Sequence, residues 1–236
     1  MQSSTIGTHI TLLGCPATAE LVHTPIDPSL MQRWASWLTS DEKSRFANYR
    51  RREDQQLFVA RHGLARECLA NQLSLTPESI RLVSLPSGKL GWNAHDLGYE
   101  QTLIDFSVSR ATGVAAAAVC KTYLVGIDVE RICLLPEIKT LATQNLHPVE
   151  LKYWQQLPEA TRLHAYYRLW VVKEAYAKAL GVGLTLPPCD ILANEAMNNN
   201  RGIVRSDMYS APTNEAEFWL TRVSTDKVLA VVVLKR

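Results

Sequence analysis

The sequence lacks the features that mark several common classes of protein. Its longest apolar runs, residues 114–120 and 228–234, are far shorter than the ~20 residues that span a membrane. Its first residues contain no basic stretch followed by an apolar block, so we expect no signal peptide. The five cysteines are odd in number and none lies at a C-x-x-C spacing, which suits free thiols in a reducing compartment. We therefore expect a cytoplasmic protein with no membrane partner.

An excess of one charge is also missing. The formal net charge is +2, too small by itself to indicate a nucleic-acid-binding protein. The strongest basic run is the arginine triplet at residues 50–52, and only Phe46 and Tyr49 lie near it. Nucleic-acid binding would favour several such clusters with aromatic residues between them. We expect no nucleic-acid partner, which leaves a nucleotide phosphate, an acidic protein surface or solvent to face the triplet.

What the sequence contains is enough apolar material for a folded core, with 47% hydrophobic and 20% charged residues. Periodicity and turn residues predict helices and strands along the whole chain. We expect strands at 9–14, 80–85, 104–108, 114–120, 123–131, 217–223 and 227–234, helices within 29–73, 134–144, 148–156 and 160–180, a turn at 86–88 and a loop at 198–202.

The predicted elements fall into two similar series. Residues 38–42 and 146–150 each open a helical stretch that is followed by hairpins. This pattern predicts an α+β fold made of two similar α+β halves packed as a pseudo-dimer, an N-terminal half at 1–120 and a C-terminal half at 121–236. No Gly-, Ser- or Pro-rich linker separates the halves, so we expect them to pack closely, with the site at their junction. We also expect the protein to be a monomer.

Two acidic residues share one face of the strand predicted at 123–131. Asp128 and Glu130 are two residues apart and project together, while Val125, Ile127 and Val129 face the other side. Two carboxylates held together repel each other unless a cation or a proton intervenes. Mg²⁺, which prefers oxygen ligands, would resolve that repulsion. The alternative is a pair of solvated acids, one of them in an ion pair with Arg131.

The helix predicted at 160–180 carries a second pair of charges. Glu174 and Lys178 are four residues apart and share a face, with Trp170 one turn before Glu174. An ordinary surface ion pair would explain the spacing. A functional interpretation requires Glu174 to join Asp128 and Glu130 as a metal ligand and Lys178 to meet an anionic substrate, together neutralising a pyrophosphate in the transition state.

These motifs together resemble a known family. Residues 126–130 (GIDVE), followed about 40 residues later by residues 170–178 (WVVKEAYAK), resemble the paired signature of 4′-phosphopantetheinyl transferases. The length and the two halves resemble the surfactin-synthetase-activating (Sfp-like) type of this family. Residues 106–109, 181–184 and the pair Gly88-Lys89 also match its pattern, so the resemblance covers about residues 40–185.

The resemblance implies a reaction. The enzyme would move the phosphopantetheine arm of coenzyme A to a serine of an apo acyl or peptidyl carrier protein and release adenosine 3′,5′-bisphosphate. Asp128, Glu130 and Glu174 would hold Mg²⁺. Glu174, or a metal-bound water, would take the serine proton, and Lys178 would stabilise the leaving phosphate. The residues implied to bind coenzyme A are Arg52, Lys89, Ser109, Arg110, Lys173 and Lys178.

The chain departs from the family pattern at two positions. Arg110 stands where relatives have a histidine that meets the 3′-phosphate, and Leu90 replaces a proline. Arginine is a permanent cation with two parallel donors, so a phosphate contact is compatible with the change, whereas a role for a neutral imidazole is not. Two other functions are compatible with the sequence: a non-catalytic relative that binds coenzyme A or a carrier protein, and an unrelated metal-dependent phosphohydrolase.

Overall fold

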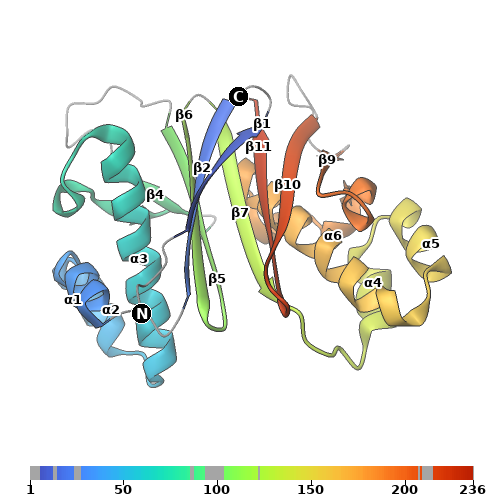
Figure 1. Cartoon of the computed structure of the whole chain (residues 1–236), viewed down its shortest axis with the longest axis horizontal. Coiled ribbons are helices and arrows are strands. Elements are labelled where there is room, and N and C mark those ends of the chain that lie inside the picture. The colour runs from blue at the N-terminus through green and yellow to red at the C-terminus, as the bar shows by residue number, and fades with distance from the viewer. Residues whose placement is uncertain are drawn as a thin grey trace.

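The computed structural model describes residues 6–12, 15–23, 28–85, 88–93, 104–121, 123–206, 208 and 215–235; side chains are described from residue 28 onward, except those of residues 184 and 215. Its helices and strands are distributed over the whole described chain (Figure 1). In chain order they are β1 (Ile6–Leu12), β2 (Cys15–His23), α1 (Pro28–Ser36), α2 (Ser40–Ala47), α3 (Arg52–Leu73), β3 (Leu82–Ser84), β4 (Leu90–Trp92), β5 (Ile104–Ala111), β6 (Val114–Lys121), β7 (Leu124–Arg131), α4 (Ile138–Asn145), α5 (Pro148–Gln156), α6 (Glu159–Leu180), β8 (Ile191–Leu192), β9 (Arg201–Ser206), β10 (Glu215–Ser224) and β11 (Lys227–Leu234).

The elements follow one order twice. The first series is β2, three helices, the short strands β3 and β4, and the β5–β6 hairpin; the second is β7, three helices, β8 and β9, and the β10–β11 hairpin. Both hairpins are antiparallel. The predicted α+β fold class is confirmed. The division into halves at 1–120 and 121–236 stays a prediction.

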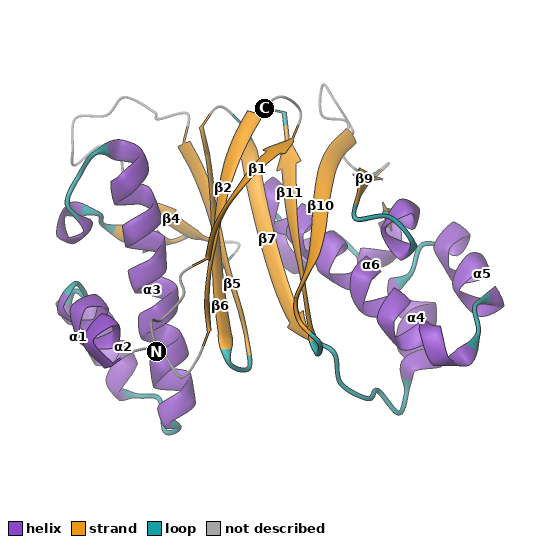
Figure 2. Cartoon of the chain, viewed as in Figure 1, coloured by secondary structure: helices purple, strands orange, loops and turns teal. Residues whose placement is uncertain are grey.

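The molecule consists of four layers (Figure 2). One sheet has the strand order β1-β2-β6-β5 and the other β7-β11-β10-β9-β8. Alternate residues of β6, such as Ala116 and Ala118, pack against Ile127 of β7 and Val231 of β11, so the two sheets share a core. α3 covers the outer face of the first sheet and α6 that of the second. In the described parts of the chain, no helix combines the length and apolarity needed to cross a membrane.

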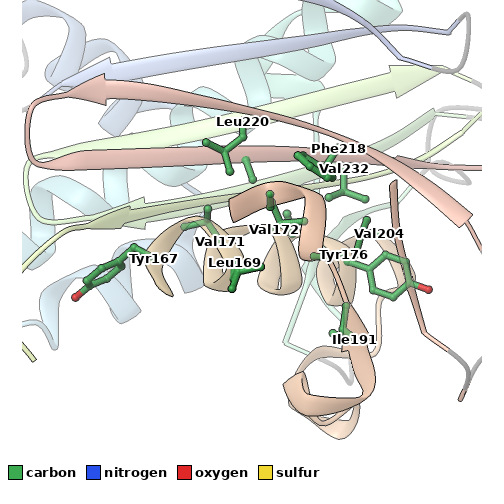
Figure 3. Packing of buried hydrophobic residues seen from close by; sticks show 14 of the residues in the cluster. Tyr167, Leu169, Val171, Val172, Tyr176, Ile191, Val204, Phe218, Leu220 and Val232 are labelled. Atoms are coloured by element: carbon green, nitrogen blue, oxygen red, sulfur yellow. The ribbon is translucent and has the colours of Figure 1, made fainter. Parts of the chain in front are cut away.

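α6 is buried on most sides. Leu169, Val172 and Tyr176 are almost completely inaccessible to solvent. They pack with Phe218 of β10 and Ile191 of β8, as Figure 3 shows. Apolar residues around most of a helix are typical of one that neighbouring elements enclose. α6 ends at Gly181, whose left-handed backbone (φ 72°) terminates the helix, as expected for a C-cap glycine. The core of the second half therefore fixes α6 rigidly against its sheet.

The middle helix of each series begins with a similar cap, in which a glutamate accepts the backbone N–H of the capping residue. Thr39 Oγ1 accepts the Glu42 N–H, and a Glu42 carboxylate oxygen accepts the Thr39 N–H at 3.0 Å. Before α5, Glu150 Oε2 likewise accepts the His147 N–H at 2.9 Å, and His147 Nδ1 accepts the N–H of Val149 at 3.2 Å. A capping box satisfies two backbone donors that a helix start otherwise leaves unpaired. These are the two helix openings that the sequence pattern predicted.

Each capping glutamate also pairs with a buried cation of the following long helix. Arg66 of α3 lies 2.9 Å from Glu42, and Lys173 of α6 lies 2.6 Å from Glu150. Each of the four side chains is at most 8% exposed to solvent. Removing one member of such a pair would leave an unpaired buried charge, which is strongly destabilising. The two pairs therefore fasten the capped helix of each series to the long one.

Several predicted boundaries are wrong. The strand predicted at 9–14 overlaps β1, which begins earlier, at Ile6, and ends at Leu12; β2 was not predicted, and residues 13–14 lie outside the described residues. The helix predicted from residue 134 begins at Ile138, because Pro136 disfavours helical backbone before it. β9 begins at Arg201, within the predicted loop. The strand predicted at 104–108 extends to Ala111, which places Arg110 in β5, and the turn to β6 is Thr112-Gly113. Pro86 and Ser87 of the turn predicted at 86–88 are not among the described residues.

Candidate active site between β5, β7 and α6

β7 separates its apolar and acidic residues by strand alternation, as predicted. Val125, Ile127 and Val129 face the core between the sheets. The other face, which carries Asp128, meets α6. That contact depends on Gly126, because a Cβ there would lie 1.8 Å from the carbonyl oxygen of Ala175. The glycine of the GIDVE segment therefore lets the backbone of α6 lie directly on β7, which brings the helix residues to the acidic face of the strand.

Asp128 is the centre of a buried polar network. Its side chain is 5% exposed, and its Oδ1 accepts hydrogen bonds from Ser109 Oγ (2.8 Å) and from Lys178 Nζ (2.5 Å). Lys178 also donates to Ser109 Oγ at 3.1 Å. The second carboxylate oxygen, Oδ2, is buried without a hydrogen-bond partner. A buried, unpartnered carboxylate oxygen is costly, so this atom is suited to a cation or a proton donor supplied from outside the chain.

The other two acids lie within electrostatic range of Asp128. Burial, and then the charge of Asp128, raise the pKa of Glu130 to about 7, although a hydrogen bond with Trp170 and the charge of Lys178 oppose the shift. Burial and the charge of Asp128 also raise the pKa of Glu174, against the effect of Lys178. Three carboxylates that repel one another favour uptake of a proton or of a cation.

These residues fit the chemistry of a divalent cation. Among the described residues, no group of three His, Cys, Asp or Glu side chains has the arrangement of a formed metal site. The carboxylates of Asp128, Glu130 and Glu174 nevertheless repel one another, and Asp128 Oδ2 lacks a partner. Carboxylate oxygens are the ligands that Mg²⁺ prefers. Metal binding by this trio stays a prediction that the donor set supports.

A cavity of about 180 Å³ opens beside Lys178. It lies where α3 and β5 approach α6. Both acidic and basic side chains reach it, together with two glycines that follow α6. The cavity is lined by Arg61, Gly88, Lys89, Leu90, Ser107, Val108, Glu174, Lys178, Gly181 and Gly183. Residues of both predicted halves therefore form its wall, as expected for a site at their junction.

Arg61 of α3 lines this cavity, and Arg110 of β5 lies within electrostatic range of Arg61. Arg61 is partly buried, and burial together with the charge of Arg110 lowers its pKa. Arg110 is 43% exposed and lies 3.9 Å from Asp54, so its ion pair is loose. Two guanidinium groups close enough to repel one another attract an anion such as a phosphate. The coenzyme contacts implied by the family resemblance include Arg110 but not Arg61.

Lys89 also lines the cavity, but protein acceptors already surround its ammonium group. Lys89 Nζ lies 2.8 and 3.0 Å from the two carboxylate oxygens of Asp105 and 3.3 Å from the Val125 carbonyl oxygen. Asp105 in turn accepts the Val125 N–H at 2.8 Å. This cluster joins β5 to the start of β7. Sequence reasoning missed Asp105, whose alternation with Phe106 along β5 was the available signal.

Two of the predicted coenzyme-binding residues lie elsewhere. Arg52 is exposed at the first residue of α3, about 14 Å along the helix axis from Arg61. It borders a different cavity, beside Met31 and Phe46. Lys173 is 1% exposed and its Nζ donates to the carbonyl oxygens of Pro188 (2.8 Å) and Ile191 (2.6 Å) as well as pairing with Glu150. These contacts are those of a structural lysine and do not support coenzyme binding. Lys173 points away from the cavity although Glu174 lines it, because consecutive helix residues point in different directions.

Known proteins are similar in sequence to the segment that carries Asp128, Glu130, Glu174 and Lys178. The family model described as the 4'-phosphopantetheinyl transferase superfamily matches residues 124–232, from β7 into β11. The chain is 31% identical over 164 residues to 4'-phosphopantetheinyl transferase HetI of Nostoc sp., which covers 68% of this chain and 67% of the relative. It is 27% identical over 161 residues to the putative 4'-phosphopantetheinyl transferase slr0495 of Synechocystis sp., covering 68% and 64%.

A third relative is 4'-phosphopantetheinyl transferase gsp of Aneurinibacillus migulanus, 28% identical over 140 residues, which are 58% of each chain. The matched part thus spans less than two thirds of the second and third relatives. The match to HetI reaches that length, and the family model includes both the acidic strand and the helix of Glu174 and Lys178. The chain belongs to the 4'-phosphopantetheinyl transferase superfamily.

Proposed function

We propose that this protein transfers the 4′-phosphopantetheine arm of coenzyme A to a serine of an apo acyl or peptidyl carrier protein. In this reaction the serine Oγ forms a bond to the β-phosphorus of coenzyme A, and the bond from that phosphorus to the bridging oxygen breaks. Adenosine 3′,5′-bisphosphate is the leaving group. The observation that carries the proposal is the Asp128–Lys178–Ser109 network at the wall of a cavity that also contains Glu174 and Arg61.

Glu174 is the group best suited to take the serine proton. It lines the cavity, and its pKa is raised by burial and by Asp128. A carboxylate whose pKa moves toward neutrality is a stronger base while it remains largely ionised at working pH. Proton transfer to Glu174 would also relieve its repulsion from the neighbouring acids. Its position on the rigid helix α6 would fix the direction from which the serine approaches.

Cations at the cavity wall would orient coenzyme A and stabilise the departing phosphate. Lys178 supplies an ammonium group between Asp128 and the cavity, where negative charge develops on the leaving group. Arg61, with Arg110 beside it, supplies positive charge for further phosphates. Lys89 would contribute a phosphate contact only by giving up one of its present acceptors.

Asp128, Glu130 and Glu174 would hold Mg²⁺. The ion would neutralise the pyrophosphate of coenzyme A during the transfer. The unpartnered Oδ2 of Asp128 and the mutual repulsion of the three acids support this assignment. The same proposal treats the protein as a cytoplasmic monomer without a nucleic-acid partner, in keeping with its small net charge and single arginine triplet.

The test is magnesium-dependent labelling of an apo carrier protein with a fluorescent coenzyme A, followed by gel fluorescence and by chromatography of the nucleotide product. We expect labelled carrier protein and adenosine 3′,5′-bisphosphate. Asp128→Ala should abolish labelling, whereas Asp226→Ala, in the turn between β10 and β11, should not. Coenzyme A binding without labelling would identify a non-catalytic relative, and release of inorganic phosphate would identify a phosphohydrolase.

A further inference from the structure

One edge strand of the first sheet lies against one edge strand of the second at the site. β5 is an edge strand of the first sheet and β7 of the second. Phe106 and Val108 of β5 belong to the core beneath α3. The alternate residues Asp105 and Ser109 face β7, where Asp105 accepts the Val125 N–H at 2.8 Å and Ser109 Oγ accepts the Val129 N–H at 3.4 Å. Polar side chains of β5 thus bond to the exposed backbone edge of β7.

The Ser109 hydroxyl group makes three hydrogen bonds within the site. Its hydroxyl accepts from Lys178 Nζ and from the Val129 N–H, and a hydroxyl has only one proton to donate. That proton goes to Asp128 Oδ1, at 2.8 Å. Ser109 is 7% exposed, so water would not readily replace these contacts. The hydroxyl is therefore bonded to both groups at once and fixes the Lys178 ammonium and the Asp128 carboxylate relative to each other.

The contacts of Ser109 and Lys178 with one carboxylate oxygen of Asp128 leave its other oxygen, Oδ2, for a different partner. Because Oδ1 is occupied by Ser109 and Lys178, Oδ2 is left buried and free of hydrogen bonds. A carboxylate that could rotate would exchange its two oxygens between these surroundings. With Ser109 present, one oxygen is reserved for the protein and the other for an external partner. Groups that hydrogen-bond to a metal-binding carboxylate orient it in this way.

We propose that Ser109 is a positioning residue for the metal ligand Asp128 and for Lys178, and that it does not act as a contact of coenzyme A. This inference rests on the proposed function, since it assigns Ser109 to the Mg²⁺ side of the same site. It replaces the coenzyme-binding role that the family resemblance implied for this serine. The residue belongs to the N-terminal series and acts on the carboxylate and the lysine of the C-terminal one.

The test separates the two ligands. Mg²⁺ is titrated into protein saturated with coenzyme A, and coenzyme A is titrated into protein in EDTA, both by isothermal calorimetry. Loss of a hydrogen-bond partner of a metal ligand typically weakens metal binding by about 10- to 100-fold. We therefore expect Ser109→Ala to raise the Kd for Mg²⁺ by about that factor and to leave the Kd for coenzyme A in EDTA unchanged.

Two variants control the experiment. Ser109→Thr keeps the hydroxyl on a β-branched residue that strands accommodate well, and should retain most of the Mg²⁺ affinity. Ser44→Ala removes a hydroxyl from α2, where it donates to the Ser40 carbonyl oxygen outside the site, and should leave the Kd for Mg²⁺ unchanged. Thermal unfolding of each variant establishes that it is folded before titration.

The opposite pattern would overturn the inference: a raised Kd for coenzyme A in EDTA with an unaltered Kd for Mg²⁺ in Ser109→Ala. Wild-type values for both constants in that variant would overturn it as well. Failure of the proposed function looks different, because then the wild-type protein itself would bind no Mg²⁺ or label no carrier protein.

Discussion

The two long helices, α3 and α6, place the same pair of residue types in different surroundings. Each helix has 22 residues and contains a buried cation followed at once by a glutamate: Arg66-Glu67 in α3 and Lys173-Glu174 in α6. Glu67 receives hydrogen bonds from Arg33 (2.9 Å) and from the indole nitrogen of Trp34 (3.1 Å). Glu174 instead faces the cavity, with Asp128 as a repelling neighbour.

The difference shows how a repeated framework acquires one site. In both helices the cation pairs with the glutamate of a capping box, so that contact belongs to the framework. The following glutamate has two donors in one helix, which stabilise it as a structural anion. In the other it is left with like charges, which makes it available for a proton or a metal ion. A signature that contains both residues therefore mixes a structural position with a reactive one.

The largest expected effect comes from exchanging the two glutamates for glutamine. Glu174→Gln should lower kcat for carrier-protein labelling by about 10²- to 10⁴-fold, because it removes the proposed base. Glu67→Gln is the matched control and should keep the wild-type kcat, with a lower thermal unfolding temperature. Labelling rates and thermal unfolding of both variants test this. Equal losses of activity in the two would show that the helices do not differ in the proposed way.

The buried cations should behave alike. Lys173→Met leaves Glu150 buried without its partner, and Arg66→Met does the same to Glu42, so each should lower the free energy of unfolding by about 3–5 kcal/mol. Urea denaturation measures this. Adding Glu150→Gln to Lys173→Met removes the unpaired charge and keeps an acceptor for the Ala193 N–H, so it should restore part of the stability. A Lys173→Met protein of normal stability with weakened coenzyme A binding would contradict the structural role.

The sequence predicted the parts of this arrangement that depend on local patterns. Strand alternation placed Asp128 and Glu130 on one face, helical spacing joined Glu174 to Lys178, and β11 was predicted with its observed bounds. Local spacing cannot indicate which side chains meet across elements. Lys173 directly precedes Glu174 in the sequence, and nothing local shows that it pairs with Glu150 instead of facing the site. Asp105 was missed for the same reason, since its partner Lys89 lies 16 residues away.

The same limit explains Arg52 and Arg61. An arginine triplet is conspicuous in the sequence, whereas an isolated arginine within a helix is not. The packing of α3 against its sheet decides which arginine reaches the cavity, and that depends on helix rotation. Arg61 is nine residues after Arg52, two and a half turns further along, and so lies on another side of α3.

Two glycines at helix contacts give a smaller effect that still distinguishes the halves. In Gly126→Ala the added methyl would lie 1.8 Å from the Ala175 carbonyl oxygen, and in Gly63→Ala it would lie 2.2 Å from Trp34 Cγ. Each substitution should destabilise the protein by about 1–3 kcal/mol or more through overpacking. Only Gly126→Ala displaces α6 from β7, so only it should also lower kcat for the folded fraction.

Urea denaturation and labelling, normalised to folded protein, provide both quantities. If Gly63→Ala lowered kcat as much as Gly126→Ala does, the glycine contact of α6 would not be what brings Glu174 and Lys178 to Asp128. The comparison is matched, because both variants add one methyl group at a helix contact.

The smallest effect concerns the protonation of Glu130. Its pKa is about 7 in the folded protein, above the ordinary 4.5, so the native state binds the extra proton between these values. The free energy of unfolding of the metal-free protein should therefore decrease as pH rises from about 4.5 to about 7, by about 1 kcal/mol for this partly exposed group. Glu130→Gln should remove this dependence.

With saturating Mg²⁺ the carboxylates would bind as anions, so near pH 7 metal binding should release a proton, which calorimetry in two buffers of different ionisation enthalpy detects. A Glu130→Gln protein that released the same proton would assign it to another group, with Glu174 the first candidate because its pKa is raised by the same two causes, burial and Asp128.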